Sequence, residues 1–231
     1  MSGLAEMPAD AALAALLDAT LLDGTASPQR VREFALDAQG AGCAAVCVHA
    51  AHLSSVADLG IPVAVVVAFP HGADTATAKA QATADAVASG AAEIDMVMRL
   101  DALLDGDRQT ALNDLRAVVR AAEGKVVKAI LETGVLTGAA FELACEVVAE
   151  SGADFAKTST GRGPRGASLE DVLRMRELLP DRVAIKAAGG IRTRQFAEQL
   201  IAAGATRLGV SSWRSVLGAA EISSSSDSSG Y

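Results

Sequence analysis

Short apolar runs rich in branched residues recur along the whole chain at a nearly constant interval, and this regularity restricts the possible folds. Between Cys47 and Ser211 the carboxyl ends of consecutive runs lie about 27 residues apart, which is the length of one strand and one helix. The runs predict eight strands, of which the first is the weakest, at residues 19–22, 44–48, 63–69, 93–98, 125–131, 154–157, 183–186 and 206–210. Apolar residues at helical spacing predict helices between them, at residues 28–39, 75–89, 108–122, 138–150, 169–179 and 193–202.

Eight parallel strands that alternate with helices in a chain of 231 residues predict an α/β fold of the (β/α)8 (TIM barrel) type. The competing arrangement is an open doubly wound sheet, but no glycine fingerprint follows the first strand. We expect one barrel domain over residues 1–222. Residues 223–231 read SSSSDSSGY, and such a polar segment buries too little apolar surface to offset its ordering entropy. We therefore expect a flexible Ser-rich tail there.

Charge and composition exclude several classes of partner. The chain has 28 acidic and 20 basic residues, a net charge of −8, and only 3% aromatic residues, which argues against nucleic-acid binding. No apolar run reaches the roughly 18 to 20 residues that cross a bilayer, and the start of the chain lacks the basic residues of an export signal. We expect no membrane association and a cytoplasmic location. The three cysteines lack CxxC spacing, and the histidines lack neighbouring ligands, so we expect neither a metal nor a cofactor.

Lysines carry the strongest indication of chemistry. The chain has five lysines and three times as many arginines, so a lysine inside an apolar strand needs an explanation. Lys128, Lys157 and Lys186 lie in VVKAIL, DFAKTST and VAIKAAGG. Lysine, unlike arginine, loses its proton when it is desolvated or lies beside another cation, and only the neutral amine attacks a carbonyl. The pattern is typical of a site that forms a Schiff base.

Two of these lysines are expected to be neighbours. Lys157 and Lys186 end consecutive strands, and the carboxyl ends of barrel strands converge on the catalytic face. Two ammonium groups within about 6 Å lower the pKa of one of them. The alternative is that each lysine caps a helix or pairs with an acid at the barrel rim.

Carboxylates within apolar segments are the natural partners of these lysines. Asp95 lies in the run EIDMVM, and a buried carboxylate without a partner is costly. Placed beside the lysines, Asp95 could relay protons through a water molecule, although a purely structural role is the alternative. Asp18, which precedes the first predicted strand, and Glu132 are interpreted as support residues.

Glycines and serines after the last two strands indicate a phosphate site. Gly189 and Gly190 follow the seventh predicted strand, and Ser211 and Ser212 follow the eighth. Glycine lets the backbone approach a ligand closely, and backbone N–H groups in such loops bind anions. Barrels often hold phosphate after these two strands. The loop TSTGRGPRG after the sixth strand adds two arginines, Arg162 and Arg165.

Taken together, the stretches AAVCVHA, VVVAFPHG, AAEIDMVM, VVKAILETG, GADFAKTSTG and IKAAGGIRT resemble the deoxyribose-phosphate aldolases, in order, from about Asp18 to Ser212. The resemblance implies a metal-independent class I aldolase, a lyase that reversibly cleaves 2-deoxy-D-ribose 5-phosphate to D-glyceraldehyde 3-phosphate and acetaldehyde. It implies that Lys157 forms the Schiff base, that Lys186 perturbs it and assists proton transfer, and that Asp95 donates and accepts protons.

The same resemblance implies secondary positions. Pocket-lining residues would be Asp18, Thr20, Cys47, Lys128 and Thr160, and phosphate-contacting residues would be Gly161, Gly189, Gly190, Ser211 and Ser212. Some members use a C-terminal tyrosine on a mobile tail to move a proton, which makes Tyr231 a candidate relay. Arg162 stands where relatives often carry an aromatic residue or a lysine, so its contact with phosphate is left open.

Three readings of the function remain at this point. The first is the aldolase, whose partners are a small sugar phosphate and aldehydes. The second is another phosphosugar barrel enzyme, and the third is a binder of sugar phosphates without catalysis. A homodimer is compatible with the resemblance, and the sequence alone leaves the oligomeric state open.

Overall fold

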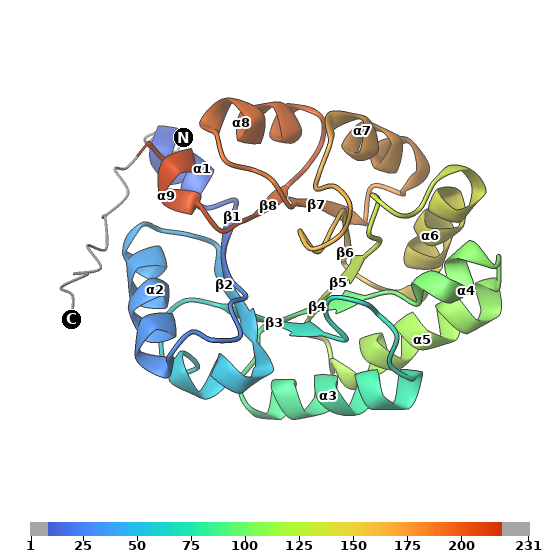
Figure 1. The fold of residues 1–231 in the computed structure, drawn as a ribbon, viewed down its shortest axis with the longest axis horizontal. Helices are drawn as coiled ribbons and strands as arrows, with labels where there is room; N and C mark the ends of the chain where they lie inside the picture. The colour runs from blue at the N-terminus through green and yellow to red at the C-terminus, as the bar shows by residue number, and fades with distance from the viewer. Residues whose placement is uncertain (1–8, 219–231) are drawn as a thin grey trace, which may run out of the picture.

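The computed structural model describes residues 9–218, and these form a closed barrel of eight parallel strands in sequence order, in which β1 also pairs with β8 (Figure 1). The (β/α)8 prediction is therefore confirmed. The strands are β1 Leu17–Leu21, β2 Ala45–His49, β3 Val63–Val67, β4 Glu93–Val97, β5 Val126–Ile130, β6 Phe155–Lys157, β7 Ala184–Ala188 and β8 Arg207–Val210. The predicted tail at residues 223–231, with Tyr231, lies outside the described residues, so these predictions stay untested.

Helices surround the barrel as an outer ring (Figure 1). They are α1 Ala9–Ala14, α2 Pro28–Gly40, α3 Ala76–Ala88, α4 Leu100–Leu104, α5 Arg108–Ala121, α6 Gly138–Ser151, α7 Leu169–Leu178, α8 Arg194–Ala202 and α9 Trp213–Val216, with a 3₁₀ helix, η1, at Ala50–Ser55. Within residues 9–218 none of these helices has the length and apolar character needed to span a bilayer.

Local chemistry fixes where several helices begin. Ser27 and Thr193 cap α2 and α8 by accepting hydrogen bonds from the backbone N–H three residues on, which satisfies a donor that the helix cannot pair itself. Pro28 follows as the first residue of α2, where its missing N–H costs nothing. At the end of α6, Gly152 adopts a left-handed conformation with φ of 92°, and this turns the chain into β6.

The predicted strands are correct to within a few residues, with two shifts that matter for the site. β1 begins at Leu17, so Asp18 lies inside the first strand rather than before it. β7 runs to Ala188, so Lys186 lies in the middle of its strand and not at its end. Both shifts place an ionisable side chain deeper in the barrel than the sequence indicated.

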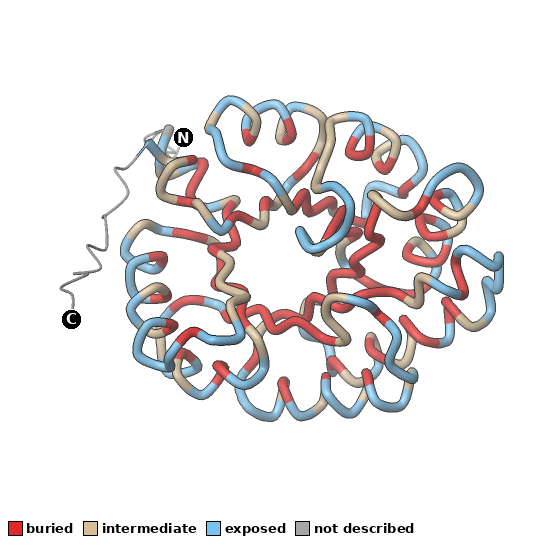
Figure 2. The backbone as a smooth tube through the Cα atoms, in the orientation of Figure 1, coloured by how far each residue is buried: buried red, intermediate tan, exposed pale blue. Residues whose placement is uncertain are grey.

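Apolar packing lies mainly between the strands and the helices. The strands and the inner faces of the helices are buried, whereas the outer helix faces are exposed (Figure 2). Successive residues of a strand point to opposite faces, so the alternate positions point into the barrel. Inside it, one small apolar cluster forms around Cys47, Ala64 and Val66, and much of the remaining interior is ionic.

Two left-handed glycines allow a test of how tightly the loops are packed. A Cβ added at Gly72 would lie 2.1 Å from the backbone oxygen of Met98, whereas one at Gly42 would meet nothing within 4 Å. Both have φ between 70° and 76°, so alanine is strained at either position by about 1–2 kcal/mol. We expect Gly42→Ala to lower the unfolding free energy by that amount only. Gly72→Ala should cost about 3 kcal/mol or more, because the loop must move as well. Urea unfolding measures both, and equal losses would refute the packing argument.

Candidate active site

Three lysine side chains converge on one carboxylate inside the barrel. Asp95, from β4, accepts from Lys128 Nζ at 2.9 Å through Oδ1 and from Lys157 Nζ and Lys186 Nζ at 2.7 Å through Oδ2. All four side chains are buried, with at most 4% of each exposed. The structure thus gives Asp95 the lysine partners that its sequence context led us to expect.

Strand register explains why Lys157 and Lys186 meet. Lys157 of β6 lies directly opposite Lys186 of β7 in the parallel ladder, and both side chains point inward. Their amines bond to the same oxygen of Asp95. The predicted neighbourhood of the two nitrogens is therefore present in the structure.

A second carboxylate lies beside the first. Asp18 Oδ2 accepts from Lys128 Nζ at 3.1 Å and from Lys186 Nζ at 2.5 Å, and its Oδ1 accepts from Arg207 at 2.7 Å. Asp18 is fully buried, because its position inside β1 points its side chain at the barrel axis. It holds two of the lysines that also bond to Asp95.

Sequence reasoning missed two members of this network. Glu93 pairs with Lys128 and, at 3.4 Å, with Arg207. Glu93 lies two residues before Asp95 on the same face of β4, and Arg207 lies opposite Lys186 in the β7–β8 ladder. Because residues two apart in a strand point to the same face, the position of Asp95 could have indicated that Glu93 also points into the barrel. Arg207 was overlooked because arginines were interpreted as solvated charges.

The pKa values of the three lysines move apart. Burial is the largest influence on the pKa of Lys157 and lowers it; Asp95 partly opposes this effect, and the charge of Lys186 adds to it. Burial acts in the same direction on Lys186, but Asp18 and Asp95 outweigh it and raise that pKa. The surrounding carboxylates outweigh burial at Lys128 and raise its pKa well above the ordinary value. Burial, more than the crowding cation of the sequence argument, thus favours the neutral amine of Lys157.

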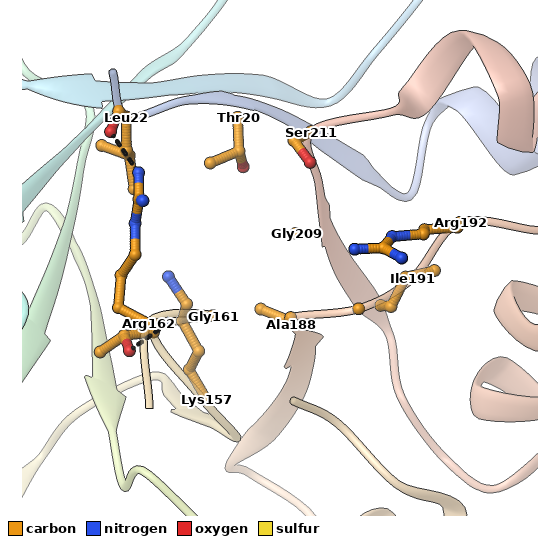
Figure 3. A pocket seen from close by; sticks show the side chains of 13 residues that line it. Thr20, Leu22, Lys157, Gly161, Arg162, Ala188, Ile191, Arg192, Gly209 and Ser211 are labelled. Atoms are coloured by element: carbon orange, nitrogen blue, oxygen red, sulfur yellow. Dashed lines mark hydrogen bonds between the residues drawn. The ribbon is translucent and has the colours of Figure 1, made fainter. Parts of the chain in front are cut away.

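A cavity of about 310 Å³ opens above Lys157 at the carboxyl ends of the strands. Among residues 9–218, Lys157 is the one buried lysine that lines it, and Figure 3 shows its amine pointing into the pocket. The other lining residues are Thr20, Leu22, Thr160, Gly161, Arg162, Ala188, Gly189, Gly190, Ile191, Arg192, Gly209 and Ser211.

The structure separates the predicted site residues into two groups. The cavity is lined by Thr20 and Lys157 from the strands and by Thr160, Gly161, Gly189, Gly190 and Ser211 from the mouth loops. The others do not line it, and they are Asp18, Cys47, Asp95, Lys128, Lys186 and Ser212. Five of these are buried, and the carboxylates and lysines among them bond to one another directly behind Lys157. Ser212 instead stands at the start of α9.

Three glycines shape one side of the cavity. Gly161, Gly189 and Gly190 all adopt positive φ, between 75° and 92°, so the backbone can present itself to a ligand without side chains in between. A Cβ at Gly166 would lie 2.2 Å from the oxygen of Gly189. The loop after β6 therefore packs backbone against backbone on the loop after β7.

Arginines of the mouth have different roles. Arg192, which sequence reasoning missed, lines the cavity, and Figure 3 shows its guanidinium directed toward Gly209. Arg162 also lines the cavity but donates to the backbone oxygen of Leu22 at 2.8 Å, across the mouth (Figure 3). Arg165 turns away and pairs with Asp171, so it braces the loop. The position of Arg192 directly after GGI was a signal that could have identified it.

Glu132 supports the mouth from below. It is buried, has a left-handed φ of 56°, and accepts the backbone N–H of Thr160 at 3.2 Å through Oε2. The Thr160 hydroxyl donates to the same oxygen. This fits the support role expected for Glu132, because it fixes the loop that leads into Gly161.

Cys47 packs in the barrel interior and does not line the cavity. Cys47 is fully buried in the apolar cluster, and burial raises the pKa of its thiol, so it packs as a small hydrophobic residue. Within the described part of the chain, no group of three His, Cys, Asp or Glu side chains is arranged to hold a metal ion. The carboxylates of the barrel interior are occupied by lysines and Arg207.

Comparison with known proteins gives a consistent picture. A family model described as "DeoC/LacD family aldolase" matches residues 13–218. A deoxyribose-phosphate aldolase of Bacillus cereus (strain B4264) is 41% identical over 204 residues, which are 86% of this chain and 92% of that protein. The solved structure of an aldolase named QR15 superposes with a TM-score of 0.86 at 34% identity, covering 89% of this chain and 94% of its own. A deoxyribose phosphate aldolase from Aeropyrum pernix, described as tetrameric, gives 0.83 at 29% identity and covers 89% of each chain.

Proposed function

This chain belongs to the DeoC/LacD family of aldolases, and from that premise we propose that it reversibly cleaves 2-deoxy-D-ribose 5-phosphate to D-glyceraldehyde 3-phosphate and acetaldehyde. The observation that carries the proposal is the placement of Lys157. It is buried, its pKa is lowered, and its amine alone among the buried lysines of residues 9–218 reaches the cavity.

The chemistry follows from a neutral amine at the base of a cavity. Lys157 attacks the aldehyde carbon, C1, of the open-chain sugar, and loss of water leaves a protonated imine that can accept electrons. The C3 hydroxyl then loses its proton, the bond between C2 and C3 breaks, and its electron pair forms an enamine with the imine. Glyceraldehyde 3-phosphate departs. Protonation of the enamine at C2 and hydrolysis of the imine release acetaldehyde and restore Lys157.

Asp95 and Lys186 are assigned to proton movement and orientation. The lysines hold the pKa of Asp95 well below its ordinary value despite burial, so this carboxylate is ionised when substrate arrives. It fixes the amine of Lys157 at 2.7 Å. We assign to the Asp95–Lys186 pair the transfer of the C3 hydroxyl proton by way of a water molecule. Lys128 and Asp18 hold this pair in place from behind.

The far end of the substrate is assigned to the glycine side of the cavity. Backbone N–H groups near Gly161, Gly189 and Gly190, the Ser211 side chain and the Arg192 guanidinium suit a phosphate dianion. Binding there uses remote energy to fix C1 near Lys157. We also propose Thr20 and Thr160 as substrate contacts.

Arg192→Gln should separate phosphate binding from catalysis. We expect KM for 2-deoxyribose 5-phosphate to rise about 10- to 100-fold, because a charge-assisted contact of roughly 1.5–3 kcal/mol is lost. The rate with unphosphorylated 2-deoxyribose should change less than about twofold, which steady-state kinetics on both substrates measures. Arg194→Gln is the control, since Arg194 pairs with Glu198 on the surface of α8 and should leave both reactions intact. Equal losses with both substrates would remove Arg192 from the phosphate site.

A product assay tests the function itself. Purified protein given 2-deoxyribose 5-phosphate should release acetaldehyde and glyceraldehyde 3-phosphate in equal amounts. A phosphosugar isomerase would convert the sugar without breaking a carbon–carbon bond, and a non-catalytic binder would bind it without turnover. Either result would overturn the proposal in favour of that alternative.

Assembly and domain limits stay proposals. We propose a homodimer, which sedimentation of the purified chain tests; the tetramer belongs to the Aeropyrum pernix relative. We also keep residues 1–222 as a single barrel domain and Tyr231 as a candidate proton relay, both to be tested by truncation.

A further inference from the structure

Seven ionisable side chains fill the barrel interior behind the cavity and form what we call the buried charge cluster. Its members are Asp18, Glu93, Asp95, Lys128, Lys157, Lys186 and Arg207. At least 92% of each side chain is shielded from solvent, except Arg207, whose side chain is 18% exposed. Arg207 lies within 5.7 Å of the centre of the Phe155 ring.

Charges in this cluster do not balance when every member is ionised. Four cations then face three carboxylates, which leaves one uncompensated positive charge in a region largely shielded from solvent. Such a charge is costly, and a buried amine responds by losing its proton. One neutral lysine makes the cluster three against three.

Contact geometry determines which amine is neutral. Arg207 retains its proton at any ordinary pH. Lys128 touches three carboxylates, and Lys186 touches two. Lys157 touches one, a single oxygen of Asp95 that it shares with Lys186. Neutralising Lys157 therefore sacrifices the fewest ionic contacts.

We propose that Arg207 and Glu93 are positioning residues which set the protonation state of Lys157 from the far end of the buried charge cluster. Neither lines the cavity, so neither touches substrate. This inference rests on the proposed function, because it concerns the same Schiff-base amine. The inference assigns Arg207 and Glu93 an effect on the amine of Lys157 that is transmitted by other members of the buried charge cluster.

Coupling runs through contacts that the structure shows. Arg207 donates to Asp18 at 2.7 Å, and Asp18 binds Lys186 at 2.5 Å. Lys186 and Lys157 then meet at one oxygen of Asp95, each at 2.7 Å. Glu93 enters the cluster by its ion pair with Lys128, whose amine bonds to the other oxygen of Asp95.

The other ionisable groups around Lys157 are the same in every variant that is compared. From β2 the neighbouring ionisable group is Cys47, whose thiol is kept neutral by burial. β3 consists of apolar residues throughout. At the mouth Arg162 and Arg192 line the same cavity, and Glu132 lies beneath Thr160. All of these stay unchanged in the experiment below.

Two substitutions of opposite charge give a signed test. Arg207→Met removes a cation, so the protonated form of Lys157 is favoured and its pKa should rise. Glu93→Gln removes an anion, so that pKa should fall. For unit charges roughly 10 Å apart at an effective dielectric constant of about 20, Coulomb's law gives a shift on the order of one pH unit. The double variant restores the charge count and should return close to the parent value.

The readout is the pH dependence of Schiff-base formation. Acetaldehyde and borohydride are added to the intact protein over a range of pH, and the rate at which Lys157 becomes ethylated is measured by mass spectrometry. The rate rises with the neutral fraction of the amine, so its midpoint follows the Lys157 pKa. We expect a higher midpoint for R207M and a lower one for E93Q. Arg120→Met, an exposed arginine on α5, is the control and should not shift the midpoint.

Opposite shifts support the inference, because a merely structural role would change rates without moving the midpoint in two directions. Unshifted midpoints, or shifts of the same sign, overturn it while leaving the proposed function intact. Absence of any adduct on Lys157 in the parent protein overturns both. Should R207M not fold, the downward shift of E93Q alone decides the question.

Discussion

Lys157→Arg is expected to reduce kcat/KM for cleavage of 2-deoxyribose 5-phosphate by about 10³-fold or more, while the protein still folds. Arginine can still donate a hydrogen bond to Asp95 at Oδ2, and it adds one permanent positive charge to the buried charge cluster. It does not lose its proton at working pH and forms no imine. The substitution thus removes the nucleophile. Steady-state kinetics measures the loss of activity, and far-UV circular dichroism shows whether the fold is kept.

Lys125→Arg provides the matched control for this variant. Lys125 is exposed just before β5, and the same change of residue there should leave activity within about twofold, as expected for a surface position. If Lys157→Arg kept a rate near that of Lys125→Arg, covalent catalysis by Lys157 would be refuted.

Asp95→Asn is expected to damage both activity and stability. The change leaves three buried amines without their shared carboxylate, and breaking such a buried ionic contact costs about 3–5 kcal/mol of unfolding free energy. Loss of the proton-transferring and orienting group should also lower kcat about 10²- to 10⁴-fold. Urea unfolding and steady-state kinetics at neutral pH give the two values.

The contribution of Asp95 to the unfolding free energy should depend on pH. The lysines lower the folded-state pKa of Asp95, so its contribution is fully present above the unfolded value of about 3.9 and is lost as pH falls through the folded pKa. Below about pH 4 the stability difference between the parent protein and Asp95→Asn should therefore shrink.

Asp114→Asn is the control for Asp95→Asn. Asp114 forms a buried ion pair with Lys79 at 2.7 Å, between α5 and α3 and away from the cavity. Its replacement should also lower stability but leave kcat within about twofold. If the two variants behaved alike in kcat, Asp95 would be a structural acid and nothing more.

The order of strands and helices could be predicted from the sequence because it depends on local patterns. Each βα unit repeats the same alternation of branched apolar runs and helical spacing, and a parallel sheet places the ends of these runs on one face. The meeting of Lys157 and Lys186 followed from the same logic, since they lie one unit apart. Position along the chain was sufficient for both conclusions.

Other parts of the site depend on contacts that the sequence does not specify. The first strand, LDATL, has a single β-branched residue, Thr20, and carries an aspartate at its second position, so its start was misplaced and Asp18 was left outside the barrel. Arg207 was passed over because the argument treated lysine as the informative cation. The charge count of the interior becomes visible only when all the strands are closed into one barrel.

The central claim is that Lys157, and no other lysine, carries the substrate as a Schiff base, and trapping the adduct tests it most directly. Acetaldehyde and borohydride are added to the parent protein, and the digested chain is mapped by mass spectrometry. We predict one ethyl group, located on Lys157 and abolished by Lys157→Arg. An ethyl group on Lys128 or Lys186, or no adduct at all, would contradict the account.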